Sequence, residues 1–160
     1  SAWQENSNGL EFKVFDKKNL AAVNPKILMP RVIKEPHLEA GTVYLMDKNG
    51  NFRNINAEKR VASGTYFVYK TRHTKVIPYK TIVAVNGETA ETIVYDTIRE
   101  NNGKLGLTGN SLYTIQEIYP EDDKQLLAKV QLTKGQSTLT VTLVNIQENS
   151  TMLNYKLDIY

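Results

Sequence analysis

Cysteine is absent from this chain of 160 residues, and histidine occurs only at positions 37 and 73. Without cysteine the protein has no disulfide bonds, no thiol nucleophile and no cysteine-based zinc site. Acid–base catalysis usually needs a histidine or a carboxylate placed beside a second reacting group, and neither His37 nor His73 lies in such a frame. We therefore expect no enzyme activity, no catalytic residues and no cofactor.

Two short motifs resemble metal sites but lack essential ligands. His37-Leu38-Glu39 has the H-x-E form of zinc deaminases, which also require cysteine ligands. The segment from Asp47 to Glu58 places oxygen ligands at several EF-hand positions, but Phe52 replaces the glycine that the loop requires at its sixth position. We expect no metal site, and we interpret these residues as surface and turn residues.

Long hydrophobic runs and a strong charge imbalance are also lacking. No apolar segment approaches the roughly 20 residues that span a bilayer, and the N-terminal residues are polar, unlike a signal peptide. The net charge is only +3, from 20 basic and 17 acidic residues, which is too small for a dedicated nucleic-acid-binding protein. We expect no nucleic-acid partner and no membrane insertion, and we expect the chain to be excised from a larger protein.

Alternating apolar and polar residues predict strands along much of the chain. Asn49-Gly50 between two apolar runs predicts a hairpin, because this dipeptide tolerates positive φ. A second hairpin is predicted from residues 64–71 and 75–85, which are rich in β-branched and aromatic side chains. Residues 20–40, with three prolines, are interpreted as an irregular connection. Further strands are expected at residues 10–16, 111–119, 124–132, 137–146 and 152–160.

The hydrophobic pattern changes after Gly87. Ala90, Ile93, Val94, Thr97 and Ile98 fall at helical spacing, which predicts an α-helix over about residues 88–101. Acidic residues near its start and Arg99 near its end agree with the helix dipole.

A basic cluster covers the predicted second hairpin and is interleaved with tyrosines. One interpretation is an edge strand that its lysines and Pro78 protect against aggregation. The other is an edge that offers positive charge and backbone hydrogen bonds to an acidic strand of a partner. The cluster comprises Lys70, Arg72, His73, Lys75 and Lys80.

Residues 64–128 resemble the Ras-associating domain family, which has the ubiquitin-like β-grasp fold. The resemblance rests on KVIPYKTIVAVNGETAETIVYDTIRENN, at residues 75–102, and on SLYTIQEIYPEDDKQLL, at residues 111–127. It implies an α+β fold, with residues 64–160 as a Ras-associating domain and residues 1–63 as an N-terminal β-rich extension or part of a neighbouring module.

The same resemblance implies a function. In that family a hairpin edge pairs with a GTP-loaded Ras-like GTPase, so residues 76–83 would form the pairing edge in a cytoplasmic signalling protein. Lys70, Arg72, Lys75, Lys80 and Arg99 would be the partner-binding residues. The alternative is a secreted or virion-associated structural or adhesion domain with an all-β sandwich or barrel, in which residues 88–101 form strand. The sequence does not decide the oligomeric state.

Overall fold

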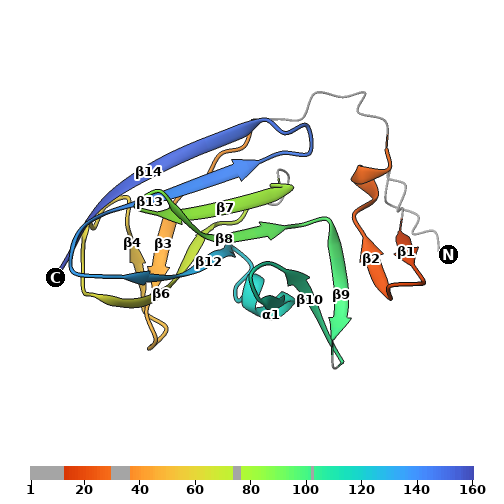
Figure 1. The fold of residues 1–160 in the computed structure, drawn as a ribbon, viewed down its shortest axis with the longest axis horizontal. Helices are drawn as coiled ribbons and strands as arrows, with labels where there is room; N and C mark the ends of the chain where they lie inside the picture. The colour runs from red at the N-terminus through yellow and green to blue at the C-terminus, as the bar shows by residue number, and fades with distance from the viewer. Residues whose placement is uncertain (1–12, 30–36, 74–76, 102) are drawn as a thin grey trace.

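The chain folds into three antiparallel β-sheets in the computed structural model, which describes residues 13–29, 37–73, 77–101 and 103–160. Sheet I has the strand order β12-β6-β3-β4, and sheet II has the order β5-β14-β13-β7-β8. Sheet III, with the order β1-β2-β9-β10-β11, lies to one side of the other two (Figure 1). One two-residue pair, β14 with β5, is parallel.

The strand bounds are as follows. Sheet I contains β3 (Val43–Met46), β4 (Phe52–Asn54), β6 (Gly64–Thr71) and β12 (Lys124–Leu132). Sheet II contains β5 (Arg60–Val61), β7 (Lys80–Val85), β8 (Glu88–Val94), β13 (Gly135–Val144) and β14 (Ser150–Ile159). Sheet III contains β1 (Val14–Asp16), β2 (Ala21–Val23), β9 (Thr97–Asn101), β10 (Lys104–Thr108) and β11 (Leu112–Thr114).

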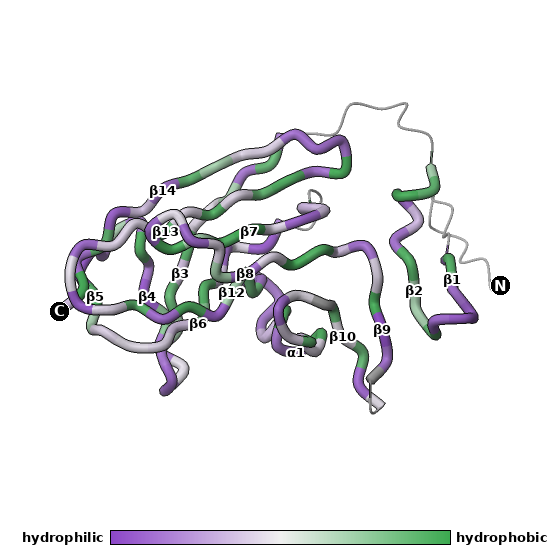
Figure 2. Tube along the Cα trace, viewed as in Figure 1, coloured by the Kyte–Doolittle hydropathy of each residue, from purple (hydrophilic) through white to green (hydrophobic). Residues whose placement is uncertain are grey.

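Sheets I and II form a sandwich around the larger hydrophobic core. Leu45, Val68 and Leu127 from sheet I and Val141 and Leu157 from sheet II are all fully buried in it. Alternate residues of these strands point inward, as the period of two requires. In Figure 2 hydrophobic residues occur along β7 and β13 of sheet II, and the turns are mostly hydrophilic.

A second, smaller core joins the outside of the sandwich to sheet III. It is built mainly from aromatic and branched side chains, among them Tyr69, Ile93, Tyr95, Leu107 and Ile118. Ile118 belongs to α1 (Ile115–Ile118), which begins with a capping box between Thr114 and Glu117. Within the described residues, α1 and the 3₁₀ helix η1 (Pro25–Ile27) are the only helical segments.

The α+β β-grasp prediction is wrong, and the all-β alternative is confirmed. The predicted helix at residues 88–101 is strand β8, a corner at Tyr95 and Asp96, and strand β9. Glu91, Ile93 and Tyr95 are all buried, at 2%, 0% and 8% exposure, so this segment has the period of a strand. The helical spacing is misleading because it leaves out Glu91, which is buried on the same face of β8 as Ile93.

The hairpin at Asn49-Gly50 is confirmed, and the second predicted hairpin is wrong. Strands β3 and β4 pair across a turn in which Gly50 has φ of +83° and Asp47 accepts two backbone N–H groups. Strand β6 instead pairs with β3 and β12 in sheet I, whereas β7 pairs with β8 and β13 in sheet II. The two segments therefore belong to different layers of the sandwich.

The other strand predictions are confirmed at residues 124–132, 137–146 and 152–160, where β12, β13 and β14 lie. The strand expected at 111–119 stops at Thr114, where α1 begins. The connection predicted at 20–40 contains β2 and η1, and its residues 30–36 lie outside the described part of the chain. Residues 10–12 of the strand predicted at 10–16 also lie outside it. The division at residue 63 remains a prediction, and strands β3 and β4 share sheet I with β6.

Candidate binding cavity

An apolar cavity of about 550 Å³ lies between sheet III and the sandwich. Its walls come from β2 and η1, from the corner between β8 and β9, from residues 77–79, and from α1 with Tyr119. Ligand pockets for small molecules usually enclose roughly 300–1,000 Å³ and are lined mainly by hydrophobic and aromatic side chains. The cavity has the size and lining of such a site.

Four of the aliphatic side chains in the lining come from four different segments of the chain. Ile98 on β9 and Leu107 on β10 are direct cross-strand partners, so their side chains lie on the same face of sheet III. Ile115 of α1 and Ile146, which follows β13, line the cavity from the sandwich side. A ligand would therefore contact residues that are distant in the sequence.

Asn24 joins the cavity wall formed by β2 and η1 to the corner between β8 and β9. Its backbone N–H donates to the Asp96 carbonyl at 2.6 Å, and its side-chain amide donates to the Tyr95 carbonyl at 3.1 Å. The Asn24 side-chain oxygen accepts the Lys26 N–H and caps η1. Asn24 therefore holds β2 and η1 close to the corner between β8 and β9.

Two tyrosines form part of the cavity wall and are held by the sandwich. The Tyr95 hydroxyl donates to the Leu126 carbonyl at 3.2 Å, and burial raises the pKa of Tyr95. The Arg72 guanidinium lies 4.4 Å from the centre of the Tyr119 ring, at cation–π distance. Burial raises the pKa of Tyr119, and the charge of Arg72 opposes that rise. Both phenols stay neutral under ordinary conditions, which suits an uncharged ligand.

The predicted partner-binding residues are not brought together in one exposed cluster. Lys70 is 1% exposed and its Nζ donates to the Thr71 carbonyl at 2.9 Å, so it is not available at the surface. Arg72 is half-buried against Tyr119, Lys80 starts β7 in sheet II, and Arg99 is exposed on β9 in sheet III. Lys75 lies outside the described residues.

The predicted pairing edge at residues 76–83 is not an edge in its described part. Strand β7 lies inside sheet II, with β13 on one side and β8 on the other. Both sets of its backbone groups are therefore already engaged in ladders, which removes the basis for strand addition at this place.

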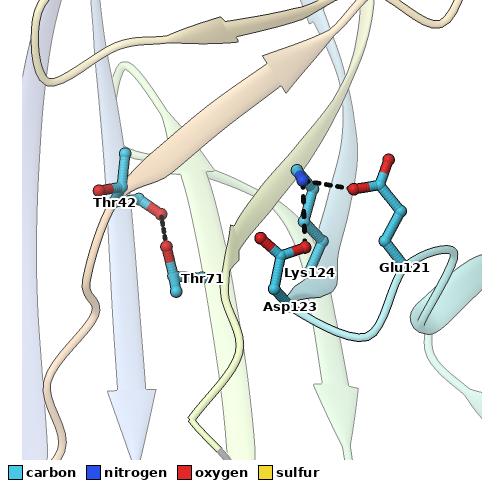
Figure 3. A network of polar contacts seen from close by, with 5 residues as sticks. All are labelled: Thr42, Thr71, Glu121, Asp123 and Lys124. Atoms are coloured by element: carbon cyan, nitrogen blue, oxygen red, sulfur yellow. Dashed lines mark hydrogen bonds and ion pairs between the residues drawn. The ribbon is translucent and has the colours of Figure 1, made fainter.

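The acidic turn after Pro120 approaches the end of β6 (Figure 3). The Arg72 N–H donates to the Asp123 carbonyl at 2.7 Å. Lys124 Nζ contacts Glu121 at 2.5 Å and Asp123 at 3.2 Å, and Thr71 donates to the Thr42 carbonyl at 3.4 Å. Lys124 thus has two acidic neighbours within the chain, and the backbone of Arg72 joins the end of β6 to the same turn.

A buried carboxylate close to the second core was not predicted from the sequence. Glu91 Oε1 accepts the N–H groups of Thr92 and Asn110, and Oε2 accepts the Tyr113 hydroxyl at 2.5 Å. Through these three hydrogen bonds the carboxylate ties β8 to Asn110 and to Tyr113 of β11. The cavity residues were not predicted from the sequence either. A signal for one nearby hairpin was present, because Asn86-Gly87 would have placed β7 beside β8.

The described residues contain no group of three or more His, Asp or Glu side chains arranged to hold a metal ion. No helix in the described part of the chain is long and apolar enough to cross a membrane.

Comparison with known proteins places the chain in a family other than the predicted one. No curated protein and no solved structure matches it significantly. The resemblance to the Ras-associating family is wrong, because the family model that matches is a different one and the ubiquitin-like fold is absent. That model covers residues 37–160, most of the chain, and the chain belongs to the family that it describes.

Proposed function

We propose that this protein is a non-enzymatic all-β binding domain, and that the cavity between sheet III and the sandwich takes a small apolar molecule. The observation that carries the proposal is the cavity itself, with a volume of about 550 Å³ and a lining that includes seven aliphatic residues and three tyrosines. A concave apolar surface of this extent is the usual property of a ligand site.

The architecture favours the structural or adhesion class over GTPase binding. The GTPase hypothesis needs a helix at residues 88–101 and a free basic edge at residues 76–83. The first is strand, and the described part of the second lies inside sheet II. A secreted or virion-associated structural or adhesion domain is the proposal that an all-β sandwich supports, and a cytoplasmic location stays a prediction.

Absence of catalysis is part of the proposal. The buried carboxylate Glu91 already accepts three hydrogen bonds from within the chain. Tyr95 and Tyr119, whose pKa values burial raises, and aliphatic side chains make up much of the lining, which also includes Lys26 and Asp96. Neutral phenols and aliphatic side chains bind without transferring protons near neutral pH.

Titration with the neutral apolar fluorophore N-phenyl-1-naphthylamine tests the site. Ile98 is half-buried in the cavity wall, and Ile98→Asn would weaken binding about tenfold, because it replaces apolar contact with a polar group. Leu105→Asn is the matched control, because Leu105 is on the next strand but is 58% exposed. Saturable binding by the wild type and the control, with weaker binding by Ile98→Asn, supports the proposal.

Two outcomes would refute it. One is a wild-type protein that shows no saturable increase in fluorescence. The other is equal loss in both variants while their circular dichroism spectra and thermal unfolding match those of the wild type.

A further inference from the structure

Strand β14 has a long edge without a neighbouring strand. It pairs with β13 along its whole length, from Val144 opposite Ser150 to Gly135 opposite Ile159. On its other side β5 covers only Asp158 and Ile159. In the described part of the chain, no backbone group pairs with the outer edge of residues 150–157. Figure 1 shows β14 along the outer margin of the sandwich.

The alternation of the ladder identifies which groups face outward. The Asp158 N–H donates to the Lys59 carbonyl on the β5 side, so it points away from β13. In an antiparallel strand every second residue repeats this direction. The N–H and C=O groups of Met152, Asn154 and Lys156 therefore point to the open side.

Both faces of this edge present side chains suited to pairing. Met152, Asn154 and Lys156 are exposed on the outer face, and Met152 is 62% exposed although it is apolar. On the other face Leu153 is half-buried and Tyr155 is buried against the sandwich core. A strand that pairs with this edge would extend both the exposed face and the core-facing, apolar face of sheet II.

The edge carries little protection against strand addition. Proteins usually protect edges with bulges, prolines or several lysines. The ladder between β13 and β14 runs through ten residue pairs without a register shift, whereas the β6–β12 and β7–β8 ladders both have one. Residues 150–157 contain no proline and a single lysine.

We propose that β14 pairs antiparallel with β14 of a second copy of this chain, about a two-fold axis at Asn154. This pairing places Met152 opposite Lys156 of the second copy, and Asn154 opposite its own equivalent. Leu153 then lies opposite Tyr155 of the second copy, an aliphatic–aromatic pair. Moving the axis to Lys156 would set two ammonium groups opposite each other, which is destabilising. The segment is thus self-complementary in charge and in hydrophobicity, and sheet II would continue through the dimer.

Sedimentation equilibrium of the wild type and three variants tests this pairing. The wild type is expected to dimerise reversibly as its concentration rises. Met152→Lys places like charges opposite Lys156 twice in the dimer and would raise the dissociation constant about three- to tenfold. Met152→Glu places opposite charges there and would lower it by a similar factor.

Thr142→Lys is the matched control. Thr142 is the β13 residue opposite Met152, so the variant adds the same charge on the same face, one strand away from the edge. It should leave the dissociation constant unchanged. A wild type that stays monomeric at every concentration overturns the proposal, and the edge then has a different partner or none. Equal weakening by Met152→Lys and Thr142→Lys also overturns it, because the edge would not be the contact.

Discussion

Replacing Lys70 by methionine should stabilise the protein. Lys70 lies on β6 with 1% of its surface exposed, opposite the buried Gln125 on β12. Its ammonium group donates to the Thr71 carbonyl, and within the described residues no acidic side chain is paired with it. Burial lowers the pKa of Lys70 from 10.5 to about 8. Methionine retains the apolar part of the side chain and removes the charge.

The magnitude follows from the two pKa values. One unit of pKa corresponds to about 1.4 kcal/mol, so at neutral pH the buried ammonium costs about 3 kcal/mol of the free energy of unfolding. Loss of the bond to the Thr71 carbonyl costs about 1 kcal/mol in return. Lys70→Met should therefore raise the free energy of unfolding by about 2 kcal/mol at neutral pH.

The same pKa values predict how stability changes with pH. Because the folded pKa lies below the unfolded one, the unfolded chain binds more protons between the two values, and stability increases as the pH rises through this window. The wild type should gain about 2 kcal/mol between neutral pH and about pH 9.5. Above about pH 10 the trend reverses, because burial holds the pKa values of Tyr95 and Tyr113 above the value of 10.0 that they have when unfolded.

Urea unfolding followed by circular dichroism over this pH range measures both effects. Lys70→Met should remove the increase with pH, and Lys129→Met, at an exposed position of the neighbouring strand β12, should retain it. The reasoning is refuted if Lys70→Met is less stable than the wild type at neutral pH. It is also refuted if the two variants show the same dependence on pH.

Three further substitutions test the two cores and the contact of β10 with β11. Leu127→Ala should lower the free energy of unfolding by about 2–5 kcal/mol, because the side chain is fully buried in the sandwich; chemical denaturation measures this. Glu91→Gln should lower the free energy of unfolding by about 1–3 kcal/mol, since a neutral amide cannot accept from all three donors as the carboxylate does. In a protein that already carries Tyr113→Phe, the same substitution should lower it much less. Gly106→Ala places a Cβ 2.5 Å from the Tyr113 carbonyl, so thermal unfolding should occur at a lower temperature than in the wild type.

Local signals in the sequence were sufficient for individual strands and for one turn. The run from Lys124 to Leu132 combines alternation with β-branched and aliphatic residues, and the strand has these bounds. Asn49-Gly50 gave the first hairpin because its geometry depends on neighbouring residues alone. The same dipeptide at Asn86-Gly87, where both residues have positive φ, marks the hairpin of β7 and β8, although the residues after it have helical spacing.

Long-range pairing could not be read from the sequence. Strand β6 finds its partners more than 15 residues before it and more than 50 residues after it, and no local pattern distinguishes these partners from β7. The cavity depends on the same kind of information, because Val23, Ile98 and Ile146 meet only after three sheets are assembled. The burial of Lys70 was missed for a related reason, since a lysine in a strand is normally at the surface.

Strand β2 and η1 form one wall of the cavity. In the part of the chain that the structure describes, residues 13–29 contribute no side chain to either hydrophobic core. The short ladder of β2 with β9 and two hydrogen bonds of Asn24 to the corner connect them to the rest of the protein. If the cavity takes a ligand as proposed, residues 13–29 would separate from β9 and from the corner without disturbing the two hydrophobic cores, and ligand exchange would then be uncoupled from global unfolding.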